Sequence, residues 1–112
     1  MTVEEAIAVF SSYSRGERAE FLARLMYELT LVARESYEAG GDGLDDQGRV
    51  RRVNELQHRV SAFLSAFLRD DAGRYPDEVL VRVILEQPDD PALGQQLGET
   101  FARLAAQRLT AA

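Results

Sequence analysis

The 112-residue chain has no cysteine, no tryptophan and no lysine, and only one histidine. Without cysteine there are no disulfides, thiolate metal sites or cysteine nucleophiles. No stretch approaches the roughly 18 consecutive apolar residues that a membrane span requires, so we expect no membrane partner. Residues 1–7 include Glu4 and Glu5 and lack the basic and apolar parts of a secretory signal. The expected location is therefore the cytoplasm.

All 13 basic residues are arginines, and the net charge is −6. This excess of acid argues against a general nucleic-acid binder, because phosphate contacts need basic residues in excess. The exclusive use of arginine is typical of a GC-rich genome and indicates a bacterial source. The chain is 46% apolar and 29% charged, the composition of a folded globule. Its length predicts one domain over residues 1–112.

Two capping boxes and one apolar stripe predict the first three helices. Thr2 with Glu5 and Ser14 with Glu17 have the capping-box spacing, which predicts helices over 3–11 and 14–38. A third helix is predicted over 46–70, after the glycines at 40, 41 and 43. Its apolar residues recur at helical spacing: Val53, Leu56, Val60, Phe63, Leu64 and Phe67. The two long helices are expected to form an antiparallel hairpin.

The last third of the chain predicts two further helices. Pro76 and Asp77 are typical of a first helical turn, and Pro88 ends the segment. Residues 79–85 are rich in β-branched side chains and fit a strand by pattern, but a lone strand has nothing to pair with, so we predict a helix. Asp90 and Pro91 begin the last helix. The predicted fold class is all-α, a four- to five-helix, mostly antiparallel bundle.

The single histidine, His58, is predicted to lie with Arg51 and Asn54 on the side of the third helix opposite the apolar stripe. Ser61, Ala62, Ser65 and Ala66 continue this side with small side chains, which favours an interfacial, hydrogen-bonded role for His58. Glu55 and His58 have the Glu-x-x-His spacing of di-metal helical bundles, and such a centre needs two copies of that pair. A single-metal site that adds Glu28 is the alternative. We expect no metal and no cofactor.

Arg51 and His58 are separated by six residues, and Arg52 and His58 by five. This spacing resembles the Arg-x(4–6)-His motif of HEPN-type ribonucleases, which are small helical bundles. The resemblance implies that the Arg and the His act together on an RNA phosphodiester at a dimer interface. Arg52 or Val53 stands where that family usually has Asn or Asp. A HEPN-like ribonuclease is the alternative function, since the acidic composition makes a nucleic-acid partner the less favoured one.

Two further groups of residues predict protein–protein association, by self-association or with another protein. Gly94, Gly98, Ala102 and Ala106 follow one another at four-residue steps in the last helix. Glycines inside a helix cost about 1 kcal/mol each relative to Ala, which predicts close packing of a helix from this chain or a second one. Tyr27 and Leu31 are predicted to point away from the apolar face of their helix, beside arginines, as interface residues do. The leading hypothesis is a homodimer or adaptor.

Overall fold

The computed structural model describes residues 1–39, 44–69 and 76–111, and these residues form five α-helices and no strand. The helices are α1 (Val3–Ser12), α2 (Arg15–Ala39), α3 (Leu44–Leu68), α4 (Asp77–Leu85) and α5 (Pro91–Ala111). The predicted all-α bundle is confirmed, and residues 79–85 are helical as predicted. The glycines at 40, 41 and 43, predicted to stop the second helix, lie outside the described residues.

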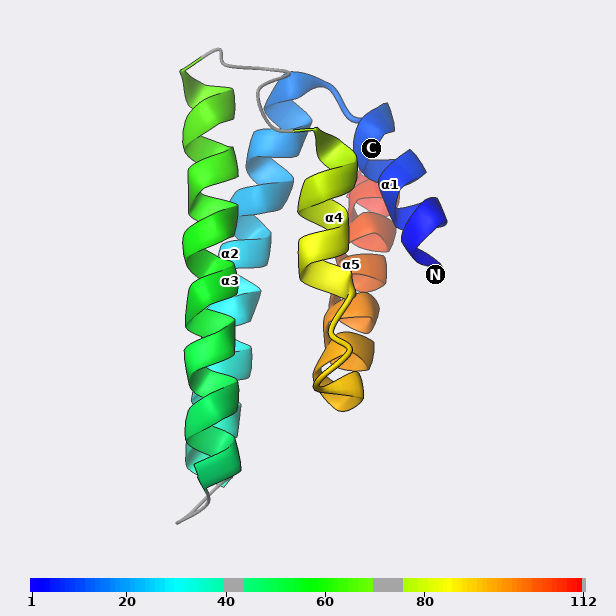
Figure 1. Ribbon diagram of the computed structural model, residues 1–112. Coiled ribbons are helices and arrows are strands. Elements are labelled where there is room, and N and C mark those ends of the chain that lie inside the picture. Colours follow the sequence, from blue (N-terminus) through cyan, green and yellow to red (C-terminus); the bar gives the residue numbers. More distant parts are fainter. Residues whose placement is uncertain (40–43, 70–75, 112) are drawn as a thin grey trace.

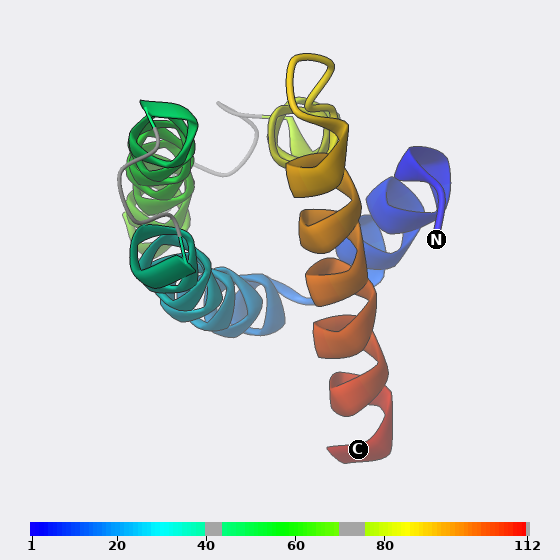
Figure 2. The same cartoon turned by 90° about the horizontal axis from the view of Figure 1, so that it is seen from below.

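The two long helices α2 and α3 lie side by side and antiparallel, and α4 runs beside α3 in the direction opposite to it (Figure 1). Seen from below, α5 crosses the molecule steeply, with its first turns next to α4 (Figure 2). The short α1 packs on the side of α4 and α5 that is remote from the hairpin. Because α4 is only 9 residues long, it covers only part of α3.

Side chains of all five helices meet in one buried apolar cluster. On α3, Val53 and Val60 are fully buried and Phe63 is 7% exposed, as the stripe predicted. Leu64 is half-buried, and the side chain of Phe67 lies outside the described part. Ala66, predicted on the polar side, is instead buried, because it follows Phe63 by three positions and shares its side of the helix. None of the described helices is long and apolar enough to cross a bilayer.

Local signals account for where the helices begin. The predicted capping box of α1 is present: the Glu5 amide donates to Thr2 Oγ1 at 3.1 Å, and the Thr2 amide donates to Glu5 at 3.4 Å. The Ser14 amide donates to the Glu17 carboxylate at 2.9 Å in the same way at the start of α2. Asp90 accepts the Leu93 amide at 3.1 Å and so caps α5. Pro76 lies just outside α4, at its N-cap position, and not within its first turn.

A half-buried arginine, Arg18, connects the beginning of α2 to α1 and α4. The Arg18 guanidinium donates to the Ser11 carbonyl at 2.8 Å, the Tyr13 carbonyl at 3.1 Å and the Asp77 carboxylate at 3.2 Å. The Ser11 hydroxyl also donates to Asp77, at 3.0 Å. The ion pair with Asp77 is mostly shielded from solvent, with 23% of the Arg18 side chain and 18% of the Asp77 side chain exposed. The two contacts to Asp77 join segments that are 59 and 66 residues apart in sequence.

Candidate functional site

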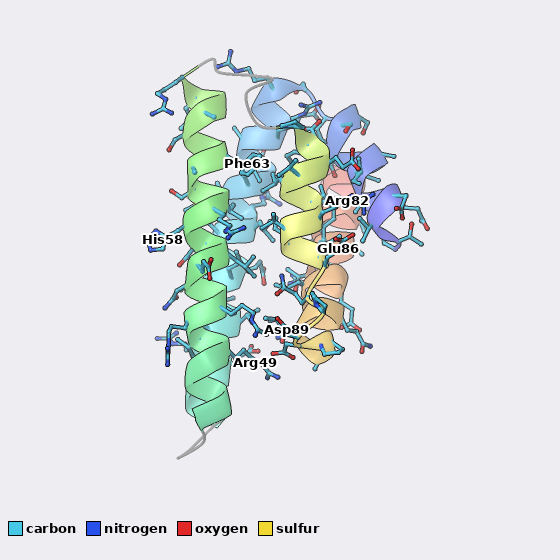
Figure 3. All side chains as sticks on the ribbon, viewed as in Figure 1. Arg49, His58, Phe63, Arg82, Glu86 and Asp89 are labelled. Carbon is cyan, nitrogen blue, oxygen red and sulfur yellow. The ribbon has the colours of Figure 1, made fainter. Side chains whose placement is uncertain are left out.

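The residues of the ribonuclease-like motif lie on the solvent-facing side of α3. Arg51, Asn54 and His58 are all exposed, and His58 points away from α4 and α5 (Figure 3). Arg52, in contrast, is half-buried and lies 3.6 Å from the Asp90 carboxylate at the start of α5. The structure therefore places Arg51, and not Arg52, on the face of His58.

The structure does not bring Glu28 together with the Glu55–His58 pair. Glu28, on α2, accepts one hydrogen bond from each terminal nitrogen of Arg103 on α5, at 3.3 and 2.9 Å. This bidentate bond raises the pKa of Arg103. Glu55 accepts from Arg59 at 3.1 Å on the surface of α3. Within the described ranges, no three carboxylate or imidazole side chains are grouped as a metal ion would require.

The small residues of α5 have unequal surroundings. A Cβ on Gly94 would lie 3.3 Å from Gln87 Cβ and 3.5 Å from the Leu85 carbonyl oxygen. This is the close approach that the sequence predicted, although the neighbour is the end of α4 and its connection to α5. Around Gly98 the described residues place no atom within 4 Å of the same position, apart from the backbone of α5 itself, and Ala102 is half-buried. Contacts within the chain therefore account for Gly94 but not for Gly98.

Tyr27 borders a groove between α2 and α5. The groove has a volume of about 430 Å³ and is lined by Glu20, Ala23, Arg24, Tyr27, Glu28, Leu104 and Gln107. The side chain of Tyr27 is 65% exposed, whereas Leu104, at the opposite wall, is 4% exposed and belongs to the core. Leu31, one turn further along α2, is half-buried. The α5 lining contains neither Gly98 nor Ala102, so the predicted interface residues belong to separate surfaces.

A second, larger groove lies between α3 and α4, and the sequence reasoning missed it. Its volume is about 860 Å³, and its lining is Arg52, Glu55, Leu56, Arg59, Arg82, Val83, Glu86, Gln87, Pro88 and Pro91. On α3, the lining residues Arg52, Leu56 and Arg59 have the i, i+4, i+7 spacing of one helix face. The spacing of the α3 residues can be read from the sequence. The residues that form the opposing wall cannot, because which of them face α3 depends on how α4 packs against it.

Ion pairs lie beside the α3–α4 groove near the start of α5 and on its α4 wall. Just before α5, Asp90 accepts two hydrogen bonds from Arg49, at 3.1 and 3.4 Å. Burial acts to raise the pKa of Asp90, but the bonds from Arg49 and the Leu93 amide, with the charges of Arg49 and Arg52, outweigh it and lower the pKa. Arg49 and Asp89 mark this end of the molecule in Figure 3.

On the α4 wall, Arg82 donates to three glutamates: Glu86 at 2.7 Å, Glu78 at 3.0 Å and Glu4 of α1 at 3.3 Å. These bonds raise the pKa of Arg82 far above its usual range. Figure 3 labels Arg82 on α4 and Glu86, which follows the last residue of α4. The α4 wall is therefore electrostatically paired within the chain.

No known protein family, curated protein or solved structure matches this chain.

Proposed function

We propose that this chain is a cytoplasmic protein that acts through protein–protein association, forming a homodimer through the surface around Tyr27. The observation that carries the proposal is that Tyr27 is 65% exposed at the edge of a groove that is also lined by the core residue Leu104. Covering an exposed aromatic ring and the apolar atoms beside it with a partner lowers the free energy, because both are removed from water.

The residues around Tyr27 have the chemistry of an energetic hot spot. Tyrosine and arginine are enriched among the few residues that dominate binding, and Arg24 lies on the rim of the same groove. Arg24 pairs with Glu20 at 3.2 Å, but both side chains are about half exposed. Such surface pairs contribute little, so Arg24 can exchange its partner at small cost.

Molar mass measured by light scattering across micromolar concentrations tests the homodimer. We expect the wild-type mass to rise towards two chains and Tyr27→Ala to weaken the dimer by roughly 30-fold, the loss of about 2 kcal/mol at a hot spot. Val79→Ala is the matched control, because Val79 is also an exposed apolar residue, 49% exposed, but lies on α4. A one-chain mass at every concentration contradicts the proposal.

One observation favours RNA cleavage as a second candidate. Arg51 and His58 lie seven residues apart on one exposed face with Asn54 between them, so a phosphodiester could reach both side chains. If this face cleaves RNA, His58→Ala and Arg51→Ala should abolish cleavage, whereas Arg52→Ala should retain it, since Arg52 faces Asp90. RNA that stays intact with the wild-type protein removes this candidate.

A further inference from the structure

The outward side of α2 carries a stripe of residues that is symmetric about Tyr27. Ala23 and Leu31 lie four residues before and after Tyr27, and Glu20 and Arg34 lie seven residues before and after it. On a helix of 3.6 residues per turn, all of these positions fall within about 40° of Tyr27, on the side opposite to the core. All but the half-buried Leu31 are exposed. The stripe therefore extends along about 21 Å of the helix surface.

The middle of the stripe is apolar. Tyr27 is 65% exposed, and Leu31, although half-buried, does not pack against the core cluster of the described residues. Ala23 is exposed and has the smallest side chain of those that line the α2–α5 groove. A large and a small side chain at equal distances on either side of Tyr27 pack against each other when two copies of α2 meet antiparallel.

The ends of the stripe carry opposite charges, which favours the antiparallel arrangement. With a two-fold axis at Tyr27, Glu20 of each copy faces Arg34 of the other, whereas in a parallel pair each would face a like charge. The order of the two signs along α2 sets this preference, and it requires no unpaired charge. Glu20 pairs with Arg24 of its own chain at 3.2 Å, and an exposed pair of this kind can take in a third charge at small cost.

We propose that two copies of the chain pack antiparallel through α2, about a two-fold axis at Tyr27. The two Tyr27 rings meet at the axis, and Leu31 of each copy lies against Ala23 of the other, at the edge of the α2–α5 groove. A two-fold interface makes every contact between different residues twice, and the stripe is self-complementary at both its apolar and its charged positions. A partner of different sequence would need no such symmetry. The arrangement rests on the homodimer proposed above and adds its register.

Disulfide trapping with Ala23→Cys and Leu31→Cys tests the register, because the chain has no cysteine and each introduced thiol is unique. In the proposed register, position 23 faces position 31 of the second copy. Two copies of position 23 are then about 12 Å apart along the helix, too far for a disulfide, and so are two copies of position 31. Oxidation of an equimolar mixture should therefore give roughly fivefold more covalent dimer than oxidation of either variant alone. Val79→Cys, at an exposed position on α4, measures the yield from random collisions.

The wild-type molar mass from light scattering separates failure of the register from failure of the homodimer. Covalent dimer that forms mainly in the mixture supports the register. A two-chain mass without that excess leaves the homodimer standing and overturns the register. Equal yields from the mixture and from each variant alone also overturn it, because parallel packing or random collision would then account for the disulfides. A one-chain mass at every concentration removes the homodimer and the register together. Both substitutions lie outside the core, and thermal melts confirm that the variants are folded.

Discussion

The two sides of α3 show how one helix divides stability from surface chemistry. On the inner side, Val53 and Val60 are fully buried in the common core. On the outer side, Arg51, Asn54 and His58 are exposed and contribute no apolar burial. The contrast teaches that truncating or charging a side chain on the inner side should change folding, whereas removing a polar side chain from the outer side should leave folding nearly unchanged. Val60→Asp, Phe63→Ala and His58→Ala test that separation directly, and Asp90→Ala and Gly48→Ala set the scale of capping and helix propensity between them; the five changes follow from the largest expected effect to the smallest.

Val60→Asp should have the largest effect. It places a carboxylate at a position with no solvent access, where the described core offers no charge of opposite sign. We expect a loss on the order of 5 kcal/mol in the free energy of unfolding, enough to unfold a small domain. Circular dichroism at 25 °C should show loss of helix. A native spectrum would mean that the inner side is assigned wrongly.

Phe63→Ala should cost about 3 kcal/mol, at the lower end for a large-to-small core change. The reason is that Phe63 is 7% exposed and lies on the side of α3 that faces α4, so part of the space can relax (Figure 3). Urea unfolding measures the change. If the free energy of unfolding equals that of the wild type, the inner side of α3 contributes less than its burial indicates.

Asp90→Ala should cost about 1–2 kcal/mol, because it removes the N-cap of α5. The same carboxylate gives a pH dependence. Its pKa is lower in the folded chain than in the unfolded one, so its stabilisation is present above about pH 4 and is lost as the pH falls through the folded-state pKa. Melting temperatures from pH 7 to pH 2 should therefore fall less in Asp90→Ala than in the wild type. Parallel curves would contradict this.

Gly48→Ala should stabilise the protein by up to about 1 kcal/mol. Gly48 is an exposed residue within α3, and a Cβ there would meet no atom of the described residues within 4 Å beyond the backbone of α3 itself, so alanine gains helix propensity without a clash. Gly94→Ala is the control, and its gain should be offset by the 3.3 Å approach to Gln87. A higher melting temperature for both variants would show that Gln87 adjusts freely.

His58→Ala should have the smallest effect, within about 0.5 kcal/mol, because the imidazole is exposed. His58→Ala and Val60→Asp give the sharpest comparison between the two sides of α3, because the positions are two residues apart and only Val60→Asp should unfold the protein. Elemental analysis of the wild type should find no stoichiometric transition metal. About one metal per chain that disappears in His58→Ala would instead give the outer side of α3 a ligand role.

Sequence reasoning reached the helices because their signals are local. Each of the two capping boxes spans four consecutive residues, and the apolar stripe from Val53 to Phe63 lies within one helix. Contacts between distant segments could not be derived in this way. Arg52 faces Asp90, which is 38 positions later, and the α3–α4 groove exists only because α4 docks beside α3. The surroundings of Gly94 and Gly98 likewise depend on where α4 ends, which periodicity does not report.

The Arg18–Asp77 tie has a consequence for the order of folding. The antiparallel pair α2–α3 is formed by neighbours in sequence, so its chain closure costs little entropy, whereas Arg18 and Asp77 close a loop of 59 residues. Contacts across such a loop are slow to form compared with local ones. We expect the hairpin to be structured in the folding transition state and the Arg18 contacts to form later, so that weakening this tie accelerates unfolding and leaves the folding rate nearly unchanged.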